Sequence, residues 1–348
     1  MEHMGYLGNY RELGQAAAEI QARLPAQLRA RCGAAGREAR HWPSDSPFRL
    51  RPNDAVPSGL YGHPASARRA TARRGRKLSA LLAALLFAAS GAAQAKTITA
   101  LTPSFFDVNK AIGSAVDGDT VIIPAGKATW TTQLALDKGI TLMGQTTTNS
   151  AAGTAVDNTI IVYNLSALMP LIRVPSVLGK SYRISGLSFQ DSPTRTVTAA
   201  NGFIGLLGSS QSVRIDHCHY FVMPFQAQCV HVGDGVYGVA DHNLIEISRQ
   251  QAFNLSNGRE GTTDPWGNFT FSLPTGFGTG RFFFIEDNYI KNPSTRITPL
   301  TDGTTGCRFV VRHNHCYNVH VTNHGTEGGI TGGRATELYD NDFHWTFP

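Results

Sequence analysis

The chain has 348 residues and a formal net charge of +6, which owes much to the Arg-rich first 76 positions and to the run Arg73-Arg74-Gly75-Arg76-Lys77. The rest carries charges of both signs and no basic stripe, so the net charge does not indicate nucleic-acid binding. Nothing in the sequence suggests a nucleotide or haem site either.

Residues 77–95 have the pattern of a secretory signal peptide. A basic flank precedes a short apolar run that ends in Ala93-Gln94-Ala95, which predicts cleavage before Lys96. An uncleaved membrane anchor is the alternative, but the run is short for a transmembrane span. We therefore expect a secreted or periplasmic protein with no membrane contact after cleavage. Residues 1–76 are an unassigned basic leader, either disordered or the result of a start codon placed too early.

The mature part, residues 96–348, begins with a predicted amphipathic helix at Phe105–Ala115. A turn at 117–119 follows, and then two strands at 120–123 and 139–143. A helix in this place suits a solenoid, whose first coil would otherwise expose its core.

A short motif recurs along the rest of the chain. Each copy has alternating apolar residues, then a polar pair, then an Asn or its substitute, then another apolar residue. The copies centre on Cys218, Asn243, Asn288, Asn314 and Asn341, with a looser one at Leu187. The steps from Cys218 are 25, 45, 26 and 27 residues, and the step of 45 fits one coil that carries an insertion.

This repeat predicts the fold class. Units with period-two alternation cannot bury their apolar face alone, but stacked about 4.8 Å apart they form one continuous core. Asn tolerates the left-handed conformation at a turn, and its amide can bond the same amide one coil above. We expect an all-β, right-handed, single-stranded parallel β-helix, a solenoid with an N-terminal capping helix.

Two segments carry a resemblance to a known family. Residues 117–126 and 138–144 closely resemble the N-terminal coil of pectate-lyase-like β-helix proteins, and Arg214-Ile-Asp-His-Cys218 resembles the W-I-D-H-C strand of pectate lyases, with Arg for Trp. The resemblance covers nearly all of residues 96–348 and implies the pectin lyase fold. The second pectate-lyase motif, R-x-P-x-x-R, which supplies the catalytic Arg, is not found, so the resemblance implies a general polysaccharide-active protein rather than pectate cleavage itself.

Alternation within the repeat predicts which side chains leave the core. The column three residues before the Asn is apolar and should face inward: Ile215, Ala240, Ile285, Val311 and Leu338. The column two before it should face outward: Asp216, Asp241, Glu286, Arg312 and Tyr339. The column four before it should also face outward and includes Arg214 and Glu337, which we expect to bind substrate.

The three stacked acids, Asp216, Asp241 and Glu286, would repel one another unless something offsets their charge. They are candidate ligands for a Ca²⁺ ion, which in pectate lyases, as the resemblance implies, bridges acidic side chains to the uronate. Asp241 and Arg312 are candidate catalytic residues in this row, and a carboxylate pair acting on a glycosidic bond is the other chemistry. The alternative is that the acids are surface groups paired with arginines.

The histidines at 217, 242 and 313 share the column before the Asn, where we expect them to bond turn backbone or the ladder. His324 is different, because it lies in a Gly-rich loop with Glu327 and Arg334. These three are candidates for base, substrate ligand and anion clamp. The alternative is a loop whose Arg334 pairs with Glu337.

The insertion in the 45-residue step holds Trp266 close to Arg259, as a sugar-binding rim would. The alternative is that Trp266 simply packs over the coil, which would give the same sequence pattern.

We expect an exported carbohydrate-active enzyme that cleaves an acidic, uronate-containing polysaccharide by β-elimination or hydrolysis. The alternative is a non-catalytic β-helix adhesin or glycan-binding surface protein. The last repeat strand is followed directly by Pro348, so we also expect a β-helix truncated at its C-terminus. The remaining cysteines are expected to be core thiols, or to form at most one or two bridges: Cys218, Cys229, Cys307 and Cys316.

Overall fold

A computed structural model describes residues 94–194, 202–221, 228–248, 251–258, 276–294, 297–324 and 332–346. Residues 1–93, which include the predicted leader and all but the last two residues of the predicted signal peptide, lie outside the described residues. The described residues are mainly β-strands, most of them in three large parallel sheets that we name A, B and C.

Neighbouring strands within each sheet come from successive turns of the chain. Sheet A consists, in spatial order, of β1 (Thr97–Thr99), β2 (Thr120–Ile122), β5 (Thr141–Met143), β10 (Tyr182–Ser185), β13 (Val213–Asp216), β16 (Gly238–Asp241), β19 (Phe283–Glu286), β23 (Arg308–Arg312) and β26 (Ala335–Tyr339). Sheet B consists of β3 (Gly126–Trp130), β8 (Thr159–Tyr163), β11 (Ser188–Asp191), β14 (His219–Tyr220), β17 (Leu244–Glu246), β20 (Tyr289–Lys291), β24 (His315–Tyr317) and β27 (Asp342–His344). Sheet C consists of β4 (Leu134–Ala135), β9 (Ile172–Ser176), β12 (Ile204–Gly208), β15 (Val230–Gly233), β18 (Phe253–Ser256) and β22 (Thr301–Gly303).

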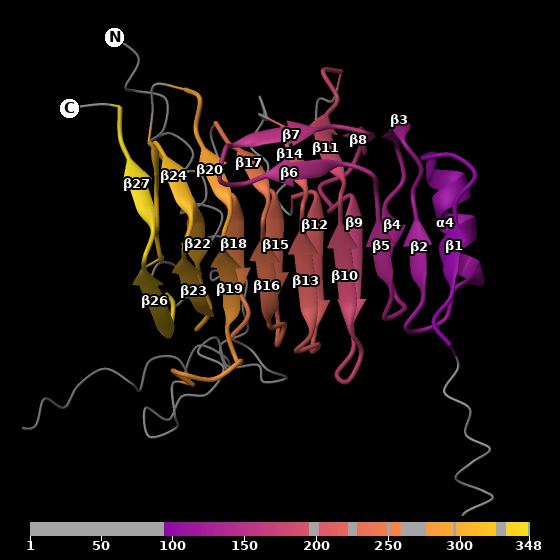
Figure 1. The fold of residues 1–348 in the computed structure, drawn as a ribbon. Helices are drawn as coiled ribbons and strands as arrows, with labels where there is room; N and C mark the ends of the chain where they lie inside the picture. The colour runs from indigo at the N-terminus through magenta and orange to yellow at the C-terminus, as the bar shows by residue number, and fades with distance from the viewer. Residues whose placement is uncertain are drawn as a thin grey trace, which may run out of the picture. The chain divides into compact units, whose positions relative to one another are not determined.

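From β8 to β24 the chain visits the three sheets in a regular order. A strand of sheet A is followed by one of sheet B and one of sheet C, and the next strand of sheet A then pairs in parallel with the previous one, as β16 does with β13. Figure 1 shows the strands of sheet A side by side in the order of the sequence, from β1 to β26. The prediction of an all-β fold with parallel sheets is confirmed.

The inward column of sheet A is formed largely as expected. Ile215, Ala240, Ile285 and Val311 are fully buried, but Leu338 is 51% exposed. Leu338 lies in β26, and within the described residues sheet C ends one coil earlier, at β22. The coil of β26 therefore has no third sheet to cover Leu338, and its predicted burial is wrong.

The repeated asparagines form a ladder of amide hydrogen bonds between coils. Asn243 Nδ2 donates to Asn288 Oδ1 at 2.9 Å, Asn288 Nδ2 to Asn314 Oδ1 at 3.0 Å, and Asn314 Nδ2 to Asn341 Oδ1 at 2.9 Å. The left-handed conformation, however, belongs to the residue before each Asn. This position, which precedes the four asparagines and the matching Cys218, has φ between 51° and 56° and is occupied by His217, His242, Asp287, His313 and Asp340. Its occupants suit the conformation because Asp and His are enriched there among residues other than glycine.

The N-terminal helix α4 spans Phe105–Ser114, one residue shorter than predicted, and buries Val108, Ala111 and Ile112. The Ser104 side chain caps it by accepting a hydrogen bond from the Asp107 amide at 3.2 Å. At the other end, Lys138 Nζ donates to the carbonyls of Ile112, Gly113 and Ala115 at 2.7–2.8 Å. A cation here stabilises the negative end of the helix dipole.

One hairpin leaves the coils. Strands β6 (Thr147–Asn149) and β7 (Thr154–Val156) pair in antiparallel fashion and, in Figure 1, lie across β11, β14 and β17. The small parallel pair β21 (Thr298–Pro299) and β25 (Val319–His320) completes the strands of the described residues.

The four cysteines after the predicted cleavage site are buried free thiols, so the expectation of core thiols is confirmed. Among the described residues, no helix is long and apolar enough to cross a membrane.

Candidate functional site

The predicted outward residues of sheet A form one row. Register places Asp216, Asp241, Glu286 and Arg312 opposite one another on successive strands. Arg214 and Glu337 lie in the neighbouring row, two residues earlier in their strands. The structure therefore brings the predicted acids and Arg312 together on one sheet.

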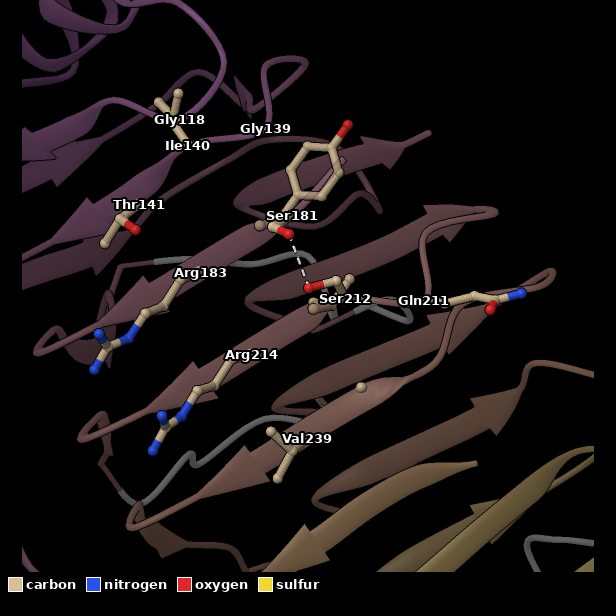
Figure 2. Close-up of a pocket in the computed structure, with 13 residues that line it drawn as sticks. Gly118, Gly139, Ile140, Thr141, Ser181, Arg183, Gln211, Ser212, Arg214 and Val239 are labelled. Atoms are coloured by element: carbon tan, nitrogen blue, oxygen red, sulfur yellow. Dashed lines mark hydrogen bonds between the residues drawn. The ribbon is translucent and has the colours of Figure 1, made fainter. Parts of the chain in front are cut away.

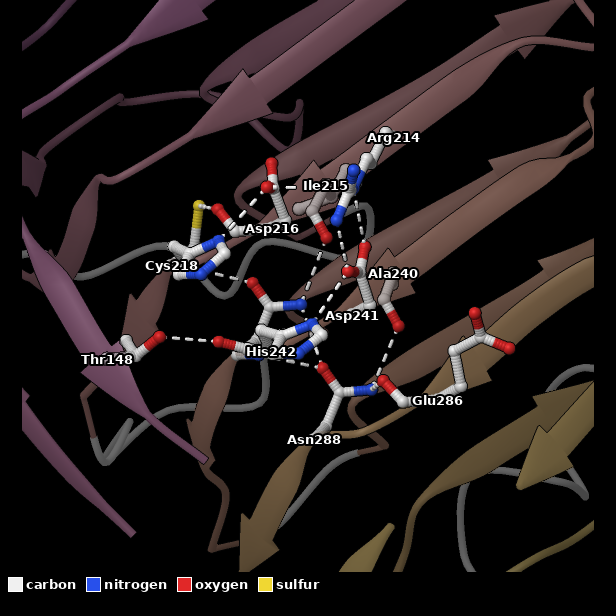
Figure 3. A network of polar contacts seen from close by, with 12 residues as sticks. Thr148, Arg214, Ile215, Asp216, Cys218, Ala240, Asp241, His242, Glu286 and Asn288 are labelled. Carbon is white, nitrogen blue, oxygen red and sulfur yellow. Dashed lines mark hydrogen bonds and ion pairs between the residues drawn. The ribbon is translucent and has the colours of Figure 1, made fainter. Parts of the chain in front are cut away.

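Each acid in this row is paired with an arginine. Arg183 contacts Asp216 through Nε at 2.9 Å and Nη2 at 2.5 Å, and Arg214 contacts Asp241 through the same atoms at 2.9 and 2.6 Å. Arg312 Nε lies 2.5 Å from Glu286 Oε2. Figure 3 shows the Arg214–Asp241 pair within this network. Two-bond pairs of this kind are among the strongest that carboxylates make with side chains, so cations offset the repulsion between the acids.

Two of the acids do not face solvent as predicted. Asp216 is fully buried and Asp241 is 4% exposed, because the side chains of Arg183 and Arg214 are bonded to them. Burial by itself raises the pKa of Asp216, but hydrogen bonds from Arg183 and His217 outweigh it and hold this pKa below the usual value for aspartate. Asp216 is therefore a carboxylate at neutral pH and cannot serve as a proton donor.

The arginines also bear on the predicted Ca²⁺ ion. A cation beside Asp216, Asp241 and Glu286 would meet three guanidinium groups and would compete with them for the same oxygens. In the part of the chain that the structure describes, no group of three His, Cys, Asp or Glu side chains is arranged to hold a metal ion. As arranged, the three carboxylates do not fit a Ca²⁺ site.

Two of the three histidines before the Asn column bond these acids rather than turn backbone or the ladder, while the His313 ring packs edge-on against Tyr339. His217 Nδ1 lies 3.0 Å from Asp216 Oδ2, and His242 Nδ1 lies 2.8 Å from Asp241 Oδ2. The two rings stack with centroids 5.3 Å apart. The predicted partners of His217 and His242 are therefore corrected to the carboxylates one residue earlier.

A groove of about 510 Å³ runs over the early strands of sheet A. Figure 2 shows Arg183 and Arg214 side by side in its lining, with Ser181 and Ser212 joined by a hydrogen bond of 2.9 Å at the strand starts. Arg214, predicted to bind substrate, thus lines a groove, but two of its nitrogens are already bonded to Asp241.

The catalytic candidates do not all converge. His324 lies at sheet C, where its Nε2 is 3.0 Å from Asp302 Oδ1, and the Gln251 amide donates to Asp302 Oδ2 at 3.0 Å. The Arg334 backbone amide bonds Cys307, at the start of β23, whereas Arg312 ends that strand. The predicted grouping of Asp241, Arg312, His324 and Arg334 is therefore divided between two faces of the coils.

No family model matches this chain, and no relative is found among curated proteins.

Three predicted site residues, Arg259, Trp266 and Glu327, lie outside the described residues.

Asp302, the partner of His324, belongs to a polar row that the sequence did not single out. Register aligns Arg173, Gly205, His231, Asn254 and Asp302 on the outer face of sheet C. His231 Nδ1 lies 2.8 Å from Asn254 Oδ1, and burial lowers the pKa of His231, an effect that this hydrogen bond only partly offsets. His231 is therefore a neutral imidazole at neutral pH. The weak alternation of residues 298–303 explains why sequence reasoning missed this strand and Asp302.

Proposed function

We propose that the chain is an exported β-helix protein of the pectate-lyase-like kind that cleaves a uronate-containing polysaccharide by β-elimination on sheet C. The fold part rests on the succession of sheets A, B and C and on the asparagine ladder, which suit a right-handed, single-stranded parallel β-helix with α4 as its cap. The resemblance of residues 117–126 and 138–144 to that family points the same way.

One observation carries the catalytic part: the Asp302 carboxylate holds the His324 imidazole at the end of an outward polar row. A carboxylate in this place fixes the tautomer of a histidine and stabilises the imidazolium that forms when it takes a proton. We assign the role of base to the imidazole that Asp302 holds in this way. His324 side-chain exposure is 38%, so a substrate can reach it.

Elimination then needs a base at C5 of the uronate and a cation that holds the polymer on the sheet. The His324 imidazole removes the proton at C5 of the uronate, the C–H electrons form the C4–C5 double bond, and the C4–O bond breaks, with the leaving oxygen taking a proton from solvent. Arg173 is exposed on the same row, four strands from Asp302 and so about 19 Å away at the usual strand spacing; it is the candidate that binds the carboxylate of another uronate unit of the polymer, while His231 and Asn254 face sugar hydroxyls between them. Hydrolysis is less favoured, because the Asp216 and Asp241 carboxylates are held by arginines.

The experiment is to incubate the protein with polygalacturonate and alginate, with and without Ca²⁺, and to follow the absorbance of the unsaturated product. His324→Ala should lower the rate by about 100-fold or more, the usual contribution of a positioned base. His344→Ala is the matched control, because His344 Nε2 also contacts an aspartate, Asp342 Oδ2 at 2.9 Å, on sheet B. Full activity of the His324→Ala protein would disprove the role of His324, and inactivity on every uronate polymer would remove the lyase proposal.

A non-catalytic glycan-binding protein is the second candidate. The mutual pairing of the charged side chains on sheet A favours it, because structural ion pairs need no substrate. Retention of the protein on a uronate polymer without release of product would support this reading.

A further inference from the structure

A second cavity lies between the β6–β7 hairpin and the turns that join sheets A and B. It has a volume of about 470 Å³ and is lined by residues 148–151 of the hairpin and by His242, Asp287, His313 and His315. Sites for small molecules usually measure about 300–1,000 Å³. This hairpin cavity lies away from sheet C, so it is separate from the Asp302–His324 pair.

Both walls of the hairpin cavity are fixed. The Thr148 hydroxyl donates to the His242 carbonyl, and Figure 3 shows this contact between hairpin and turn. Gly153, at φ 64°, packs against the Tyr289 ring so closely that a Cβ there would lie 2.5 Å from Cζ. Asp157, just after β7, accepts from the Ser188 hydroxyl at 2.6 Å and contacts His219 Nδ1 at 2.8 Å. The cavity is therefore a built feature of the fold.

The turns that line the cavity carry His and Asp side chains at a backbone position that glycine could occupy with less strain. His242, Asp287 and His313 all have φ of 54–56°, whereas the matching residue of an earlier coil is Gly186, at φ 65°. Glycine adopts this conformation without strain, while other residues held in it are strained and tend to occur where their side chains are used.

The charge of the hairpin cavity selects its ligand. Asp216, Asp241 and Glu286 each hold an arginine, but among the described residues no side chain pairs with the Asp287 carboxylate, and no Lys or Arg lines the cavity. Asp342 lies 3.6 Å from His315 and adds negative charge behind that ring. With His242 Nδ1 bonded to Asp241, its Nε2 is an acceptor in the neutral form. A carboxylate would be repelled here, whereas an ammonium group and hydroxyls would find acceptors.

We propose that the hairpin cavity binds an amino sugar unit. Its ammonium group pairs with Asp287, its hydroxyls donate to the imidazoles of His242 and His313, and Asn149 and Ser150 bond its remaining oxygens. The site holds a glycan of a different charge from the uronate polymer and does not depend on cleavage at His324.

The test is an NMR titration of the full-length protein at neutral pH with glucosamine, glucose and galacturonate, following the histidine ring protons. Glucosamine should shift the rings of His242 and His313 and bind more tightly than glucose, and galacturonate should not bind. Asp287→Asn keeps a side chain that tolerates the left-handed turn and should raise the Kd for glucosamine about tenfold or more, the loss expected for a hydrogen bond to a charged group.

Asp340→Asn is the matched control, because Asp340 has the same turn conformation, φ 51°, and does not line the cavity. It should leave the Kd for glucosamine unchanged. Binding of galacturonate as tight as that of glucosamine, an unchanged Kd in the Asp287→Asn protein, or no ring shift with any sugar would each overturn the proposal.

Discussion

Asn288 is the central member of the asparagine ladder, and its replacement by alanine tests how much the ladder stabilises the fold. Its side chain is fully buried. Oδ1 accepts from the Asn243 backbone amide at 3.0 Å and from Asn243 Nδ2 at 2.9 Å. Nδ2 donates to the carbonyls of Ala240 and Glu286 at 2.9 Å and to Asn314 Oδ1.

The expected loss follows from what the substitution leaves behind. Asn243 N–H is left buried without a partner, which costs about 1–3 kcal/mol, and the other lost hydrogen bonds add about 1 kcal/mol each where no other partner remains. Asn243 Nδ2 keeps the Ile215 carbonyl, and Asn314 Oδ1 keeps the Asn288 amide. We therefore expect Asn288→Ala to lower the free energy of unfolding by about 3–5 kcal/mol.

The assay is urea unfolding followed by circular dichroism, with the free energy taken by linear extrapolation. Asn341→Ala is the control, because Asn341 makes the same kind of contacts but is only half-buried, so water can replace them. It should cost about 1–2 kcal/mol. A loss of less than about 1 kcal/mol for Asn288→Ala, or one no larger than for Asn341→Ala, would refute the reasoning.

Three further predictions concern single groups. Burial raises the pKa of Cys218, Cys307 and Cys316 to about 12, so mass spectrometry should find these thiols unmodified by iodoacetamide in the folded protein near neutral pH and modified in urea; labelling in the folded state would contradict their burial. Because the pKa of Asp216 is lower in the folded than in the unfolded state, its stabilisation is present above its unfolded value and is lost as the pH falls through the folded one; Asp216→Asn should therefore flatten the fall of the urea midpoint below about pH 4, and an unchanged slope would argue against the ion pair. Lys96 N lies 2.8 Å from Asp119 Oδ1, so cleavage before Lys96 would place a new ammonium group against a buried carboxylate; N-terminal sequencing of exported protein should begin at Lys96, and a start elsewhere would remove the signal-peptide assignment.

The sequence was informative about the coils because their repeat is local. The spacing of Asn243, Asn288, Asn314 and Asn341 predicted both the stacking of the coils and the ladder, because residues one coil apart lie directly above each other. Even so, it did not show that the left-handed residue precedes the Asn. A turn of two residues can place the strained conformation at either one, and only the backbone decides.

The acids were harder to interpret from sequence because burial depends on neighbours from other coils. Asp216 is covered by Arg183, in the looser copy at Tyr182–Ser185, which shares the column of Arg214 and could have been noticed for that reason. His324 and Asp302 lie 22 residues apart in the sequence without any shared motif. Their contact arises only when β22 is placed beside the segment that contains Asn323.

The β6–β7 hairpin changes how a stack of coils can come apart. In a solenoid each coil touches only its neighbours, so the ends can unravel while the middle persists. The hairpin projects from the coils after β5. Its Thr148 bonds His242, which lies 94 residues further along the chain, and its Gly153 contacts Tyr289. Opening any coil between these points therefore requires the hairpin to detach, which couples the central coils into one cooperative unit.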